Sequence, residues 1–229
     1  MITMLRQRTT TTVFVVPLMT MGVLIGIVGL CWAGTPARPA SSTASCTSEY
    51  KNKAGPAKTL RAIAHSHGQW LEDRYNQRYR RANLCLADLH SASLSGANFE
   101  RANLEDANLR QANLYQTSLM HARLAGADFT SAAFEDGSVS GADMRHARLS
   151  RANFFRVIGD EAALFNSVLI GTQLHESSFE RAHFEGADIT AADFTNANVV
   201  DSFFYGANLS QATLTEADFT ETDLRQTNL

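Results

Sequence analysis

The chain has 229 residues, of which 45% are hydrophobic and 19% charged, with 14 Gly, 4 Pro and 3 Cys. This length predicts one or at most two domains, and the composition excludes a disulfide-packed mini-protein and a disordered polar tail. The net charge of -3 is unevenly divided: residues 1–81 carry 11 Lys and Arg against 3 Asp and Glu, and residues 82–229 carry 9 against 20. The first part is therefore +8, and the second, which has no Lys, is -11.

The N-terminal segment, residues 1–33, predicts a signal peptide or a membrane anchor. Arg6 and Arg8 precede a single long apolar stretch, residues 13–33. This order of charge and hydrophobicity is typical of a secretory signal, with cleavage expected after Ala33. The same stretch is long enough to span a bilayer, so a retained anchor is the alternative. Both interpretations place the remainder outside the cytoplasm, either free or held at the membrane by residues 13–33.

Two short segments follow before the pattern changes. Residues 34–57 begin with a Pro-, Ser- and Thr-rich run and predict a flexible linker. Residues 58–81 predict an amphipathic helix because their apolar side chains fall on one helical stripe. The stripe consists of Leu60, Ile63, Ala64, His67, Trp70 and Leu71. His65 and His67 have no further convergent ligands, so neither a metal nor any other cofactor is predicted.

The remainder of the chain, 82–229, is a five-residue repeat without a gap. Counting every fifth position from Leu84 gives 30 centres, of which 16 are Leu and 9 are Phe, and only Gly159 is not a large apolar residue. The position two places before each centre is Ala in most repeats, and the position between them is most often Asn or Asp. Neither an α-helix nor a β-strand places every fifth residue on the same face. The pattern therefore indicates a coil in which the chain turns one corner in each repeat. Asn and Asp suit such turns because their side chains bond to nearby backbone.

With these alanines, Asn/Asp residues and leucines, the chain resembles the pentapeptide-repeat family, whose motif is A(D/N)LXX. The resemblance covers residues 82–229 and implies an all-β solenoid: a right-handed quadrilateral β-helix with four repeats per coil and about seven coils. The preceding helix resembles the segment that often comes before the first repeat in this family. We expect it to cap the first coil, anchored by Trp70 and Leu71, because an uncapped coil exposes strand edges and apolar centres.

Aligning the centres that are four repeats apart predicts how the interior packs. Phe134 falls under Phe154, and Phe184 under Phe204, which predicts stacked aromatic pairs. Gly159 contributes no side-chain volume to the row of stacked centres to which it belongs. We therefore expect a bend, bulge or local opening around residues 157–161.

Cys46 and Cys85 would remain after signal cleavage, and an exported chain with two cysteines favours a disulfide between them. Two unpaired thiols are the alternative, and neither cysteine has a catalytic partner in the sequence. No nucleophile, base and orienting group can be aligned, so the sequence predicts no enzyme activity.

Function must therefore come from outward residues. Five apolar residues occupy outward positions and form a candidate docking patch for an unknown protein partner, although scattered surface hydrophobes are also ordinary. They are Tyr115, Phe155, Phe165, Ile170 and Tyr205. The preferred interpretation is a non-enzymatic, exported, bacterial scaffold or spacer, located in the periplasm, in a thylakoid lumen or outside the cell.

Two further predictions concern partners. The last repeats have no recognisable cap, which favours a homodimer through the C-terminal coil. Some members of the family imitate B-form DNA and bind a type II topoisomerase, and the -11 charge fits such a role in principle. The export segment opposes it, because it removes the protein from DNA. Binding to nucleic acid itself is not expected.

Overall fold

A computed structural model describes residues 57–73 and 81–229 of the chain. Residues 1–33, most of the linker and Cys46 lie outside these described residues, so the predictions about them stay predictions. The helix α1 covers Ala57–Glu72, whereas the sequence predicted residues 58–81, and residues 74–80 are again outside the described part. Within the described ranges, no helix is long and apolar enough to cross a membrane.

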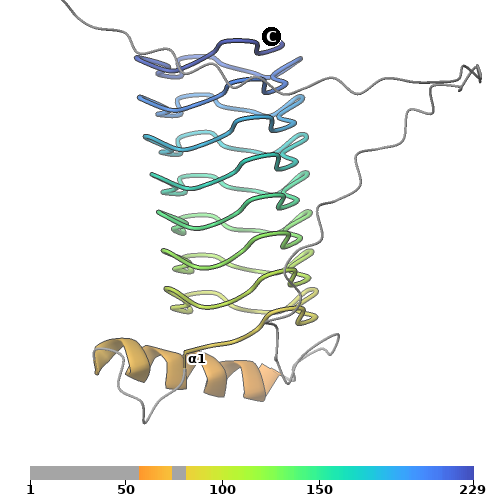
Figure 1. The fold of residues 1–229 in the computed structure, drawn as a ribbon. Coiled ribbons are helices and arrows are strands. Elements are labelled where there is room, and N and C mark those ends of the chain that lie inside the picture. Colours follow the sequence, from red (N-terminus) through yellow and green to blue (C-terminus); the bar gives the residue numbers. More distant parts are fainter. Residues whose placement is uncertain (1–56, 74–80) are drawn as a thin grey trace, which may run out of the picture. The chain divides into compact units, whose positions relative to one another are not determined.

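From residue 82 onward the backbone forms four-sided coils that stack on one another (Figure 1). Isolated parallel bridges join positions that are four repeats apart, from Asn83 with Asn103 to Asn208 with Asn228. The bridges recur once in every repeat, which gives four in each coil and confirms the predicted coil length. No strand longer than such a bridge occurs in the described residues, because the chain turns a corner after each one.

Each corner is a tight turn. In the repeat centred on Leu104, for example, the N–H of Ala107 donates to the Leu104 carbonyl at 3.1 Å, and Asp106 has a φ of +54°. A positive φ at the second central residue alone is typical of a type II turn. The same position is left-handed in every repeat from Leu86 to Gln226, and most of these residues are not glycine. The stacked hydrogen bonds therefore hold a conformation that isolated residues rarely adopt.

The Asn and Asp residues before the centres stabilise these corners, as the sequence predicted. Asn103 Oδ1 accepts a hydrogen bond from the N–H of Glu105 at 3.2 Å, and the same contact recurs along the stack, for instance from Thr195 to Asp193 at 2.9 Å. The amide of Asn103 also donates to Asn83 one coil below at 3.1 Å. These side chains therefore link the turn to the adjacent coil.

The interior contains the centres and the small residues two places earlier. Phe134 and Phe154 pack edge to face at 5.0 Å between ring centroids, and Phe184 and Phe204 stack at 4.6 Å, which confirms both predicted pairs. Buried hydroxyls that replace Ala donate to backbone carbonyls, as Thr117 does to Leu94 at 2.9 Å. Buried polar groups are thereby satisfied.

The predicted bend or opening around residues 157–161 is wrong. Gly159 donates to the Ser178 carbonyl at 2.7 Å and Glu161 to the Glu180 carbonyl at 2.8 Å, so the ladder continues unbroken. A Cβ on Gly159 would lie 2.1 Å from the ring of Phe179. The Phe179 ring occupies the space that a larger centre would fill, and the column stays packed.

The helix α1 contacts the first repeats mainly through its buried stripe. Leu60 is 5% exposed and His67 fully buried, while the predicted anchors Trp70 and Leu71 are only half-buried. Trp70 stacks on the His67 ring at 5.4 Å, and His67 faces Phe99 at 6.2 Å. His67, which sequence reasoning placed on the apolar stripe without a ligand role, therefore contacts both α1 and the coils through its ring.

Candidate functional site

The five predicted partner-binding residues do not form one patch. The four-repeat register of the coils places Tyr115 and Phe155 at one corner, Phe165 and Tyr205 at a second corner, and Ile170 at a third. Tyr115, Ile170 and Tyr205 are exposed by 40 to 43%. The five residues of the proposed docking patch are therefore distributed over three different corners of the coils.

Phe165 belongs to a row of rings that runs along one side of the coil stack, and we name it the aromatic stripe. Phe165 stacks on His183 with a centroid distance of 4.9 Å, and His183 stacks on Phe203 at 4.7 Å with an angle of 11° between the rings. Phe203 is 38% exposed, and Tyr205, two positions further along the chain, is 43% exposed. The three stacked rings come from successive coils, so the register of the coils creates the stripe.

Sequence reasoning missed His183 and Phe203. Both occupy the position immediately before a centre, where Asn or Asp is most frequent, and they are four repeats apart. Aligning the outward positions in the same way as the centres would have revealed this pair.

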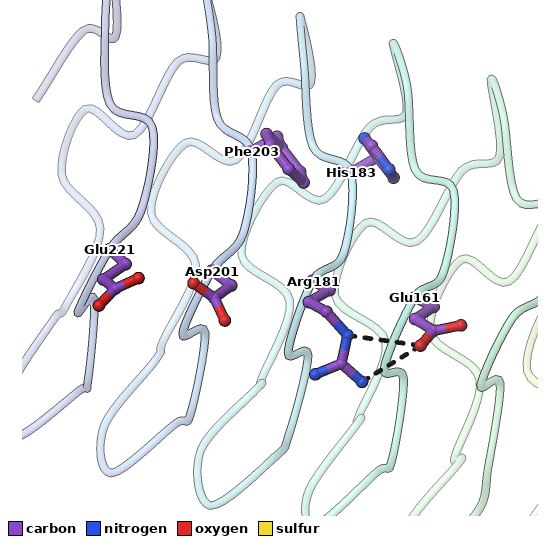
Figure 2. Close-up of a pocket in the computed structure, with 6 residues that line it drawn as sticks. All are labelled: Glu161, Arg181, His183, Asp201, Phe203 and Glu221. Atoms are coloured by element: carbon purple, nitrogen blue, oxygen red, sulfur yellow. Dashed lines mark hydrogen bonds and ion pairs between the residues drawn. The ribbon is translucent and has the colours of Figure 1, made fainter.

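An acidic row lies beside the aromatic stripe. Glu161, Asp201 and Glu221 occupy the same left-handed corner position in different coils, with Arg181 between the first two. Together with His183 and Phe203 they line an open groove of about 560 Å³ (Figure 2).

The cation in this row is already engaged. Arg181 donates through Nη2 and Nε to Glu161 at 3.1 and 3.4 Å, and through Nη1 to Glu180 at 3.4 Å. The hydrogen bond to Glu161 raises the pKa of Arg181 above its ordinary value. Asp201 and Glu221 make no ion pair within the described part of the chain, so the far end of the groove carries two uncompensated carboxylates.

The coil stack is electrically asymmetric. Residues 160–229 carry 12 Asp and Glu against 2 Arg, a net charge of -10, whereas residues 82–159 carry 8 against 7, a net charge of -1. Nearly all of the -11 charge therefore belongs to the coils that also form the groove.

The corner one repeat before the acidic row contains an arginine bound by an aromatic ring and a carboxylate. The guanidinium of Arg156 lies 4.4 Å from the centroid of the Phe155 ring and donates two hydrogen bonds to Asp136, at 2.6 and 2.8 Å. These bonds lower the pKa of Asp136. His175 stacks on the same Phe155 ring at 4.6 Å. An aromatic ring beside a carboxylate is thus an occupied guanidinium site within this chain.

Several polar side chains of the described residues are committed to the fold. Buried hydroxyls such as Ser202 and Thr172 donate to carbonyls of the adjacent coil, at 2.6 and 2.8 Å, and are committed to the fold. No group of three or more His, Cys, Asp or Glu side chains in the described ranges could hold a metal ion. Cys85 is fully buried and disulfide-bonded, and its predicted partner Cys46 lies outside those ranges.

Comparison with solved structures returned several similar chains. One is Rfr23, a pentapeptide repeat protein of the cyanobacterium Cyanothece 51142, with 34% identity, 38% of this chain covered and a TM-score of 0.37. This chain spans 58% of the length of Rfr23. A second is a pentapeptide repeat protein of the Arabidopsis thaliana thylakoid lumen, with 27% identity, coverage of 45% of this chain and 65% of that one, and a TM-score of 0.26.

A third is HetL of the cyanobacterium Nostoc sp. strain PCC 7120, a pentapeptide repeat protein involved in the regulation of heterocyst differentiation. It is 24% identical, with coverage of 62% of this chain and 80% of that one, and a TM-score of 0.24. No curated protein matched the chain.

A family model described as pentapeptide repeats matches in eight copies, over residues 76–106, 97–136, 160–196 and 192–229. These segments cover more than half of the chain and agree with the ladder of bridges between successive coils. Proteins of this kind fold as right-handed quadrilateral β-helices. By its repeats, the chain belongs to the pentapeptide-repeat family.

Proposed function

We propose that this protein is a non-enzymatic, exported scaffold that presents a rigid outward surface to a protein partner. The observation that carries the proposal is the aromatic stripe, in which Phe165, His183 and Phe203 stack on the outside of the coils. Exposed aromatic side chains offer large contact area at low entropic cost, and such residues are enriched at protein interfaces. In this proposal the β-helix has about seven coils, with α1 as the cap of the first one.

The proposed location is extracytoplasmic. Residues 1–33 have the charge and hydrophobicity of an export signal or an anchor. A disulfide at Cys85 supports the same location, because disulfides persist mainly in oxidising compartments. The protein would act in the periplasm, in a thylakoid lumen or outside the cell, either free or held by residues 13–33.

A second proposal concerns self-association. The centres Leu214, Phe219 and Leu224 are only half-buried, whereas the centres of preceding coils are buried. We propose that two copies pack these centres together. Light scattering on the full chain tests this, since the measured mass should rise with concentration, and Phe219→Lys should keep the protein monomeric. A monomeric mass at every concentration would contradict the proposal.

Binding to a type II topoisomerase as a DNA mimic is the alternative function, favoured by the -11 charge of residues 82–229. DNA carries its charge evenly along the duplex axis. Here residues 82–159 contribute only -1 of the total, so the charge pattern matches DNA over part of the stack. The scaffold proposal is therefore preferred.

Two measurements on native cells test the scaffold proposal. The mass of the N-terminus after fractionation should correspond to a start near Gly34 in the soluble extracytoplasmic fraction, or to an intact Met1 in the membrane fraction. Photo-crosslinking residues placed singly on the four sides of the stack should then give a discrete crosslinked protein from at least one side. A shorter cytosolic form would favour the topoisomerase alternative, and no crosslink from any side would contradict binding to a protein.

A further inference from the structure

The groove beside the aromatic stripe offers the same chemical groups as the occupied arginine site on the neighbouring corner. At that corner, Phe155 lies under the Arg156 guanidinium, and Asp136 accepts two hydrogen bonds from it. In the groove, Phe203 provides the exposed ring, and Asp201 and Glu221 provide the carboxylates (Figure 2). The groove therefore combines a flat apolar surface with acceptors for a planar cation.

The two arginines of residues 160–229 are engaged elsewhere. Arg181 bonds to Glu161 and Glu180, and Arg225 donates two hydrogen bonds to Asp223, at 2.9 and 2.7 Å. Arg225 also lies 6.0 Å from the Tyr205 ring. Residues 160–229 contain no other Arg and no Lys, so these coils themselves supply no further cation for Asp201 and Glu221.

These observations favour arginine over lysine. A guanidinium is planar, stacks on aromatic faces and donates two parallel bonds to a carboxylate, whereas an ammonium is a compact, strongly hydrated charge. We propose that the groove formed by Asp201, Phe203 and Glu221 binds an arginine-bearing segment of a partner protein. This inference rests on the proposed scaffold function and specifies the chemistry of the partner.

The probe is a short peptide, acetyl-Gly-Gly-Arg-Gly-Gly-Arg-Gly-Gly-amide with a fluorescent label, titrated with the full chain and followed by anisotropy. Two matched peptides replace both arginines with lysine or with neutral citrulline. The arginine peptide should bind at least about threefold more tightly than the lysine peptide, because it adds stacking and paired hydrogen bonds. The citrulline peptide should show no measurable binding.

Two variants locate the binding. Asp201→Asn combined with Glu221→Gln should weaken the arginine peptide by about tenfold or more, because charge-assisted hydrogen bonds are lost. Phe203→Ser should reduce the preference for arginine over lysine. The matched control is Glu176→Gln combined with Glu216→Gln, which removes the same charge from left-handed positions at a different corner. Circular dichroism should show all variants folded.

The outcomes separate this inference from the scaffold proposal. If the control variant weakens the peptide as much as the groove variant, binding is general charge attraction and the inference is overturned. Equal affinity for arginine and lysine peptides overturns it as well. A crosslinked partner in cells together with either result would leave the scaffold proposal standing and move the interface to another side. No crosslinked partner, with specific peptide binding, would instead contradict the scaffold proposal and leave standing only the preference of the groove for arginine.

Discussion

The imidazole of His67 accepts a hydrogen bond from the backbone N–H of Ala82 at 3.1 Å, and this contact determines its protonation state. Because Nδ1 accepts, Nε2 carries the proton and donates to the Glu100 carbonyl oxygen at 2.8 Å. A protonated imidazole has two donors and no acceptor, so protonation would break the bond to Ala82. The neutral side chain thus joins α1 to the first repeats.

The docking of α1 should weaken as the pH falls. Burial lowers the pKa of His67 below its ordinary 6.5, and the charge of Arg81 lowers it further, while Glu100 raises it through its carbonyl and its charge. The unfolded state therefore binds the proton more readily, and the free energy of unfolding should decrease as the pH falls below about 6.5. Urea unfolding followed by Trp70 fluorescence, in a Trp32→Phe background, measures this between about pH 8 and pH 5.

The variant His67→Phe keeps the ring but loses both hydrogen bonds. At pH 8 it should cost about 1–3 kcal/mol, because a buried N–H and carbonyl are left unpaired. Its stability should also depend less on pH. His65→Phe is the control, since His65 is exposed on the same helix. An unchanged pH dependence in His67→Phe would contradict the assignment.

Gly159 should be intolerant of even one methyl group. In Gly159→Ala the new Cβ would meet the Phe179 ring at 2.1 Å, so we expect a loss of about 1–3 kcal/mol from overpacking. The double variant Gly159→Ala with Phe179→Leu should recover part of that loss in thermal unfolding. Gly68→Ala has nothing within 4 Å and should leave stability unchanged or raise it. Equal effects at both glycines would argue against the clash.

Asp223 should titrate at unusually low pH. Its pKa is lowered to about 2, mainly by the side-chain hydrogen bond from Arg225 and then by the Arg225 N–H. Arg225→Leu removes the guanidinium and keeps the backbone donor, so the pKa should rise but stay below 3.8. Carboxyl NMR titration measures the change. Arg145→Leu, which removes the equivalent partner of Asp143, should leave the pKa of Asp223 unaltered.

The disulfide of Cys85 should involve Cys46. Counting thiols in unreduced, unfolded full chain should show one additional free thiol in Cys46→Ser, namely that of Cys85. Reducing the bond should destabilise the protein by about 3–4 kcal/mol in the loop-entropy model, since about 40 residues are enclosed. A thiol released by Cys31→Ser instead would assign the other pairing.

The interior of the coils was predictable because the repeat is strictly periodic. The phase of the centres gave the inward positions, and the family resemblance implied four repeats per coil. Moving four repeats along the chain then gave the neighbour of each centre, as with Phe134 and Phe154. The same arithmetic failed at Gly159, where one small residue indicated a gap. Side chains of one coil can fill space left by a small residue in the adjacent coil. Beside Gly159, the Phe179 ring of the next coil fills that space.

The sequence by itself determined the inward positions and the resemblance to the family, and that resemblance implied the coil length. This was possible because burial in a solenoid repeats with a fixed period and involves mainly neighbouring coils. Only the tertiary structure decided which outward residues meet. It separated the five predicted apolar residues among three corners and stacked Phe165, His183 and Phe203 into a stripe. It also revealed that His67 satisfies a backbone N–H in the first repeat. Such contacts depend on side-chain rotamers and on residues at different positions of the repeat in adjacent coils. The periodicity of one repeat position therefore does not predict them.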